Sequence, residues 1–193
     1  MKTTRLEAFS DGVIAILITI MVLELKTPAG QDWSELRALG HTFGFYALSF
    51  VYLGIYWNNH HHMVHMSDRV SGAVLWANLH LLFWLSLIPF GTAWVGESEI
   101  APLPTAIYGF VQMMAGLAYY ILETMLIKAQ GPHSRLQEAL GSDFKGKISV
   151  ALYAAAMLLA FVQPKVATAI YVGVAAMWLI PDRRIENHVS HPV

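Results

Sequence analysis

Six apolar segments, separated by short polar connections, occupy most of this 193-residue chain. A helix that crosses a lipid bilayer needs about 20 mainly apolar residues, so each segment has roughly the length of one membrane span. We therefore expect an all-α integral membrane protein, a single domain of six transmembrane helices over residues 1–193. The expected spans are residues 8–25, 39–57, 70–95, 103–127, 148–162 and 166–180. Pro89 is expected to kink the third span, because proline interrupts helical hydrogen bonding.

The low charge content of the chain argues against a soluble protein. Hydrophobic residues make up 56% of the sequence and charged residues only 13%, whereas soluble domains carry about 25% charged residues. The 12 basic and 13 acidic residues nearly cancel, which argues against nucleic acid as a partner. The chain has no cysteine, so no thiol is available for catalysis or metal binding. Because the common hydrolase, zinc-protease and phosphate-loop motifs are also missing from the sequence, we expect a protein that is not an enzyme.

The distribution of lysine and arginine predicts how the spans are oriented. With six spans, both termini lie on the same side of the membrane, and that side holds nine basic residues against three on the other. Basic residues concentrate on the cytoplasmic side of membrane proteins. We therefore expect a multi-pass protein of the cell membrane with both termini in the cytoplasm. The nine are Lys2, Arg5, Arg69, Lys128, Arg135, Lys145, Lys147, Arg183 and Arg184, and the three are Lys26, Arg37 and Lys165.

The first span carries polar residues at its start and an apolar stripe further along. At 100° per residue, Ile16, Ile20 and Leu23 fall within about 60° of one another on a helix. Thr19 flanks this stripe, whereas Asp11 lies about 140° from Ile16. One face can therefore be apolar while Asp11 and its neighbour in the sequence bond to another helix. An ordinary lipid-facing or packing helix explains the same stripe, because apolar faces are common in membrane helices.

A histidine-rich run, Trp57–His65, closes the second span. His61 and His65 have the i, i+4 spacing that allows two side chains to share a metal ion. One interpretation is therefore a metal-dependent membrane enzyme, and the other is a group of interfacial histidines that bond to neighbouring helix ends. We favour the second, because the remaining histidines are scattered and carboxylate ligands are nearly absent from the run. Asn78 in the third span is a plausible hydrogen-bond partner for this run or for the start of the first span.

Three stretches of this sequence resemble one known family. Arg5 precedes the tripeptide Phe9-Ser10-Asp11 at the start of the first span. The end of the same span reads Leu-Glu-Leu-Lys-Thr-Pro. The stretches Tyr56–His61 and Ala77–Leu79 follow in the second and third spans. Together they resemble the lysosomal potassium channel family, transmembrane protein 175, and specifically its short bacterial members. The resemblance covers all six expected spans in order.

The resemblance implies a potassium-selective cation channel. Bacterial members of this family are homotetramers, so the partners of each subunit would be three identical subunits and the lipid bilayer. The first helix of each subunit lines a central pore, and there is no re-entrant filter loop of the ordinary potassium channels. No cofactor is implied, since potassium is the permeant ion. A small secondary transporter and the metal-dependent enzyme remain the alternatives.

The resemblance also assigns residues. Carried over from the Phe-Ser-Asp motif, the pore constriction falls on Ile16, Ile20 and Leu23, with Thr19 as a possible polar layer. The family motif holds the first helix through buried polar contacts with neighbouring helices. In this chain that network falls on Arg5, Phe9, Ser10, Asp11, His61 and Asn78. The resemblance leaves open which histidine between positions 60 and 65 takes part.

Overall fold

The computed structural model describes residues 3–131, 137 and 144–179, and every regular element in these residues is a helix. The longest three are α1, α3 and α6, which alternate with shorter helices along the chain. In chain order the elements are α1 (Thr3–Leu23), α2 (Trp33–Ala38), α3 (Gly40–His65), α4 (Gly72–Ser86), α5 (Ile88–Glu97), α6 (Pro102–Gln130), α8 (Phe144–Leu159) and α9 (Pro164–Leu179).

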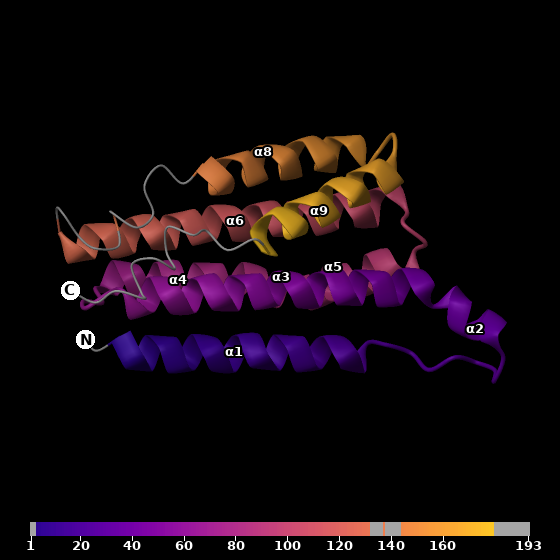
Figure 1. Cartoon of the computed structure of the whole chain (residues 1–193), viewed down its shortest axis with the longest axis horizontal. Coiled ribbons are helices and arrows are strands. Elements are labelled where there is room, and N and C mark those ends of the chain that lie inside the picture. The colour runs from indigo at the N-terminus through magenta and orange to yellow at the C-terminus, as the bar shows by residue number, and fades with distance from the viewer. Residues whose placement is uncertain (1–2, 132–136, 138–143, 180–193) are drawn as a thin grey trace.

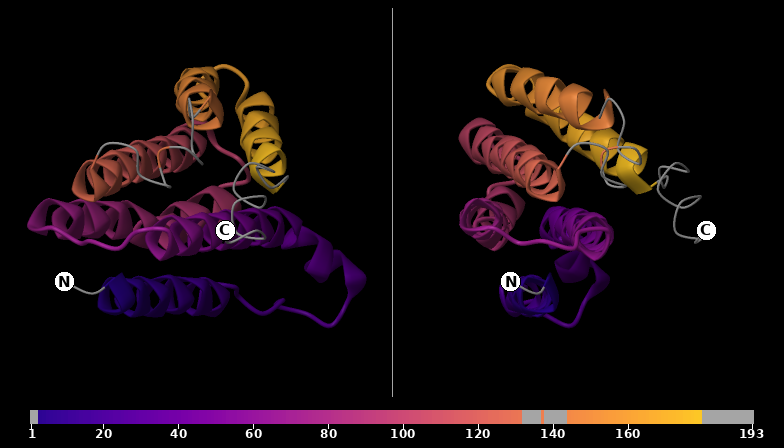
Figure 2. Two further views of the ribbon diagram at one scale, coloured as in Figure 1. Left: turned by 60° about the vertical axis from the view of Figure 1, so that its left-hand side comes forward. Right: turned by 90° about the vertical axis from the view of Figure 1, so that its left-hand side faces the viewer.

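The helices form a bundle with α1 at one edge. Figure 1 shows α1 alone along one side of the molecule and the α8–α9 pair along the opposite side, with α3, α4, α5 and α6 between them. α1 packs on α3, α4 and α5, whereas α6 packs on α4, α5, α8 and α9. The views in Figure 2 agree that none of the helices in the described residues covers the outer side of α1. The subunit therefore leaves one long face of its first helix open.

The third predicted span is interrupted, as its proline suggested. α4 ends at Ser86 and α5 begins at Ile88, so that the break falls at Leu87. Pro89 lies in the first turn of α5, where a backbone N–H would have no helical partner and its absence costs nothing. Residues 72–97 together remain long and apolar enough to cross a membrane.

The other helix boundaries differ from the predicted spans by a few residues, except in α3. The structure continues α3 to His65 rather than to residue 57, so the histidine run lies within the helix. The six-residue helix α2 was not predicted. By length and composition, three described segments are able to cross a membrane: α1, residues 72–97 and α6. α8 and α9 have 16 residues each, or about 24 Å, which is short for a bilayer core of about 30 Å.

Buried tyrosines attach the α8–α9 pair to the rest of the bundle. The hydroxyl of Tyr52 on α3 donates to the backbone carbonyl of Tyr171 on α9. The hydroxyl of Tyr171 donates in turn to the carbonyl of Thr105 on α6, at 3.1 Å. Gly109 makes room for this ring, because a Cβ atom at that position would lie 2.0 Å from the Tyr171 hydroxyl oxygen. The glycine therefore sets how closely α6 and α9 approach.

Candidate pore helix and its anchoring network

α1 has one face buried in its own subunit. The buried residues follow a spacing of three or four, which keeps them on one side of a helix that packs on α3, α4 and α5. They are Leu6, Ser10, Ile14, Leu17 and Met21. All except Ser10 are apolar, so hydrophobic burial fixes this face of α1 against the bundle.

The opposite face carries the residues predicted to form the constriction. The side chains of Ile16, Ile20 and Leu23 are 57%, 39% and 80% exposed. Thr19 is also exposed, and its hydroxyl donates to the carbonyl of Ile16 at 2.8 Å. These four residues are thus exposed on α1 in the part of the chain that the structure describes. Exposed apolar surface of this kind marks a contact with lipid, a partner or a pore.

A buried hydrogen-bond network ties the start of α1 to α3 and α4. The amide of Asn78 donates through Nδ2 to the Ser10 hydroxyl oxygen at 3.0 Å, and Ser10 donates to the carbonyl of Leu6 at 2.9 Å. The Asn78 amide oxygen lies 2.8 Å from Nε2 of His60. Since that oxygen only accepts, Nε2 of His60 carries the proton. Ser10, His60 and Asn78 are all buried.

Two polar atoms beside this network have no hydrogen-bond partner among the described residues. They are Oδ1 of Asp11 and Nδ1 of His60, and both atoms are buried. With its proton on Nε2, His60 presents Nδ1 as an acceptor, and a carboxylate oxygen is an acceptor as well. Each of these two atoms therefore requires a hydrogen-bond donor, because a buried acceptor without a donor lowers the free energy of unfolding.

The remaining residues predicted for the network lie elsewhere. His61 forms an ion pair with Glu7 of α1, with 2.7 Å between Nδ1 and Oε1. Arg5 and Phe9 are exposed in the subunit, on the same side of α1 as Ile16. The motif thus divides within the subunit into a buried part, Ser10, and an exposed part.

Three aromatic rings in the histidine run are stacked along α3. The His61 and His65 rings are stacked with 5.9 Å between their centroids, and Trp57 stacks on the other side of His61 at 6.2 Å. Within residues 3–131, 137 and 144–179, no group of three or more His, Asp, Glu or Cys side chains is arranged to hold a metal ion.

Sequence reasoning placed His61 in the network and left open which histidine of the run takes part, although the phase of α3 favours His60. The buried residues Ser49, Leu53 and Val64 follow one another on α3 at intervals of four and eleven residues, which keep them on one face. His60 falls four residues before Val64 and seven after Leu53, so it belongs to the inner face. His61 is one residue, or about 100°, off this face.

A second contact holds the far end of α1. Lys26, just beyond the helix, forms an ion pair with Glu97 at the end of α5, with 2.7 Å between Nζ and Oε1. The hydrogen bond and charge of Glu97 raise the pKa of Lys26 above its usual value. Both side chains are largely exposed, so this pair orients the segment after α1 more than it stabilises the fold.

Comparisons with known proteins point to one family. The family model described as endosomal/lysosomal potassium channel TMEM175 matches residues 5–89. A potassium channel from Chryseobacterium sp. (strain P1-3) is 52% identical over 190 residues, covering 98% of this chain and 99% of the relative. A potassium channel from Streptomyces collinus is 35% identical over 129 residues, 63% of each chain. A crystal structure described as a lysosomal potassium-selective channel TMEM175 homolog from Chamaesiphon minutus superposes with a TM-score of 0.81. It is 26% identical and covers 92% of this chain and 96% of that one.

Proposed function

Because the chain belongs to the family of the endosomal/lysosomal potassium channel TMEM175, we propose that it is a potassium-selective cation channel. In this proposal, four identical subunits surround one pore in the cell membrane, and α1 of each subunit lines that pore. The chain would cross the membrane six times, which puts both termini on one side, and the bias of basic residues favours the cytoplasm for that side. The relatives from Chryseobacterium and Streptomyces are named potassium channels as well, which supports the permeant ion.

The observation that carries the proposal is the division of α1 into two faces. One face is anchored in the subunit by apolar packing and by Ser10. The other presents Ile16, Ile20 and Leu23, exposed and uncovered. An exposed apolar face alone also fits a helix that faces lipid. The membership of the chain in a family of potassium channels favours the pore.

Apolar rings explain how such a pore closes. A narrow tube lined by isoleucine and leucine expels water, and an ion without its hydration shell cannot cross apolar surroundings. Opening then requires the side chains to rotate or the four helices to move apart. Potassium gives up its water more easily than sodium, so partial dehydration at this ring favours potassium. Thr19, next to the stripe, adds a hydroxyl layer that is able to replace part of the lost hydration.

The buried network supplies the rigidity that this mechanism needs. Asn78 and His60 hold Ser10, and so fix the start of α1 against α3 and α4. The ion pair between Glu7 and His61 adds a second link to α3. With one end of α1 fixed in each subunit, the positions of the four apolar stripes around the pore axis are defined.

A recording of the purified protein in planar bilayers tests the function. With potassium on one side and sodium on the other, we expect unitary current steps and a reversal potential shifted toward the potassium equilibrium. Transport without unitary steps would favour a secondary transporter and refute the channel. A reversal potential near zero would refute potassium selectivity while leaving a cation channel.

A further inference from the structure

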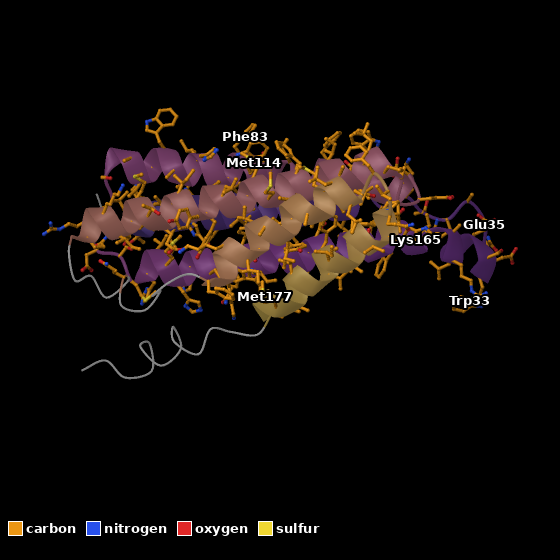
Figure 3. All side chains as sticks on the ribbon, turned by 90° about the horizontal axis from the view of Figure 1, so that it is seen from above. Trp33, Glu35, Phe83, Met114, Lys165 and Met177 are labelled. Atoms are coloured by element: carbon orange, nitrogen blue, oxygen red, sulfur yellow. The ribbon has the colours of Figure 1, made fainter. Side chains whose placement is uncertain are left out.

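The buried network around Ser10 holds only the start of α1, whereas Ile20 and Leu23 lie near its far end. Leu23 lies about 20 Å further along the helix than Ser10. Figure 3 labels Trp33 and Lys165 at the end of the bundle toward which α1 runs. The turn that carries the proposed constriction therefore needs a support at this end of the bundle.

The helix α5 packs behind this part of α1. Met21 of α1, Tyr46 of α3 and Thr92 of α5 are among the residues that line one small gap there. Met21 is buried and belongs to the same helical turn as Ile20 and Leu23. The position of α5 against α3 therefore determines where these two exposed residues stand.

The direction of α5 is not fixed by the helix that precedes it. The chain breaks between α4 and α5 at Leu87. Pro89, in the first turn of α5, lacks the N–H that would continue the helical hydrogen bonds. The direction of α5 thus depends on its contacts with α3 and α6.

A chain of buried hydrogen bonds joins α5 to these two helices. Oγ1 of Thr92 lies 2.7 Å from Oγ of Ser49 and 2.7 Å from the carbonyl oxygen of Ile88. The hydroxyl oxygens of Ser49 and Tyr108 are 3.0 Å apart, and the Gln112 amide donates to Tyr108 at 3.1 Å. The side chains that form this chain are buried.

The number of protons sets the direction of the chain. Each hydroxyl has one proton, and a backbone carbonyl only accepts. Since the amide of Gln112 donates to Tyr108, the Tyr108 proton goes to Ser49. The Ser49 proton then goes to Thr92, which donates to the carbonyl of Ile88. Thr92 is thus the residue through which the hydrogen bonds of α3 and α6 reach α5.

A glycine lets α5 approach α3 closely near the far end of α1. A Cβ atom on Gly96 would lie 2.8 Å from Cα of Thr42, a backbone atom that cannot rotate away. The next residue, Glu97, forms the ion pair with Lys26 just beyond α1. A displacement of α5 at Gly96 would therefore reach the end of the proposed pore helix.

We propose that α5 positions the constriction, with Thr92 and Gly96 as the positioning residues that set its place against α3. The proposal rests on the pore assigned to α1 and adds a support for its far end. An apolar constriction excludes hydrated ions more strongly when it is narrower, so a shift in the turn of Ile20 and Leu23 changes how much water an ion must give up. Thr92 and Gly96 are buried, and both act through α1.

Recordings from purified full-length variants in planar bilayers test the proposal. Thr92→Val removes the hydroxyl at nearly constant shape, and Gly96→Ala pushes α5 away from α3. A constriction that is no longer held in place adopts wider openings, so we expect the ratio of potassium to sodium permeability to fall about twofold or more. A variant that only folds less well would instead give fewer channels with the wild-type ratio. If Gly96→Ala does not assemble, Thr92→Val decides alone.

Matched variants separate this role from a general loss of packing. Thr92→Ser keeps the hydroxyl and should keep the wild-type ratio. Thr105→Val removes a buried hydroxyl that bonds to the carbonyl of Ala101 within α6. Gly91→Ala adds a methyl group to α5 in ordinary contact with Tyr108, 3.6 Å from its ring. Both should resemble the wild type, and an equal fall in either would overturn the proposal.

A distance measurement tests the positioning without ion flow. The sequence has no cysteine, so one nitroxide label is attached at Thr27→Cys, just beyond α1, or at Thr4→Cys, in its first turn. With Thr92→Val or Gly96→Ala added, the distances between subunits should broaden for the label at position 27 and stay unchanged for the label at position 4. Unchanged distances at position 27 would overturn the proposal. Broadened distances with a wild-type permeability ratio would refute instead the assignment of the constriction to this part of α1.

Discussion

The amide of Asn78 on α4 donates to the hydroxyl of Ser10 on α1 over 3.0 Å, while its oxygen accepts from His60 on α3. One side chain thus connects three helices in the interior of the bundle. Asparagine suits this position because it offers a donor and an acceptor on the same rigid group. The bond matters more for geometry than for net stability, since a neutral hydrogen bond contributes only about 1 kcal/mol.

Asn78→Leu is expected to destabilise the protein strongly. The change removes the donor to the Ser10 hydroxyl oxygen and leaves the N–H at Nε2 of His60 buried without its acceptor, at a cost of about 3 kcal/mol in the free energy of unfolding. The measurement is a thermal melt followed by size exclusion, with Asn58→Ala as the control, because Asn58 is exposed on α3. A melting temperature equal to that of the wild type would show that the network does not hold α1.

His60 and His61 are expected to respond differently to substitution. His60→Ala removes the partner of the Asn78 oxygen within the buried network and should lower stability by about 2 kcal/mol. His61→Ala removes only a partly exposed ion pair with Glu7, which should cost less than about 1 kcal/mol. The two variants are compared by the same melting assay. The reverse order would place His61, not His60, in the anchoring network.

The contrast between these two histidines shows what the sequence could and could not predict. The helical segments follow from the apolar runs, and the break near Pro89 follows from the chemistry of proline. The assignment within the histidine run depends on the rotation of α3 about its axis, which one residue changes by about 100°. In a run of adjacent histidines the sequence does not show this rotation, because histidines then point in several directions around the helix and each could reach Asn78.

Other features of the structure depend on contacts that no local pattern reveals. Nothing in the polar sequence before α3 predicts α2, a short helix without buried residues. The hydrogen bonds of Tyr52 and Tyr171 connect α3, α6 and α9, so they depend on how distant segments pack. The exposed face of Ile16, Ile20 and Leu23 was predictable from periodicity, whereas what that face meets in an assembly remains a prediction.

Asp11→Ala is expected to weaken the assembly more than it changes ion permeation. Asp11 lies off the apolar stripe, and its buried Oδ1 has no donor among the described residues of the subunit. In the proposed tetramer, a donor from a neighbouring subunit would satisfy this oxygen. Size exclusion of Asp11→Ala should therefore show smaller species, while the remaining channels keep their potassium preference. A stable tetramer with altered selectivity would instead move Asp11 into the ion path.

Gly109→Ala is expected to disturb the contact between α6 and α9. Its Cβ would lie 2.0 Å from the hydroxyl oxygen of Tyr171, so the ring must move and its bond to Thr105 must break. We expect a loss of about 1–3 kcal/mol, as for other overpacked cores. Gly173→Ala is the control, because no atom lies within 4 Å of its Cβ. The ring carbons Cζ and Cε1 of Tyr171 would also lie 2.7 Å and 3.0 Å from this Cβ, so Tyr171→Ala is the variant that removes the clash. A loss in the Gly109→Ala, Tyr171→Ala double variant equal to the sum of the two single losses would contradict the proposed clash.

Ile16→Asn is expected to raise the conductance of the channel and to weaken its preference for potassium. An amide in place of the isoleucine lets water remain in the narrow part of the pore, so that sodium as well as potassium keeps more of its hydration. Val22→Asn is the matched control, since Val22 is an exposed apolar residue of the same helix that points about 120° away from Ile16. Single-channel currents under potassium and sodium gradients measure both effects. Currents of Ile16→Asn equal to those of the wild type, from protein that assembles normally, would remove Ile16 from the constriction. An equal gain in Val22→Asn would show that the pore does not lie on the Ile16 face of α1.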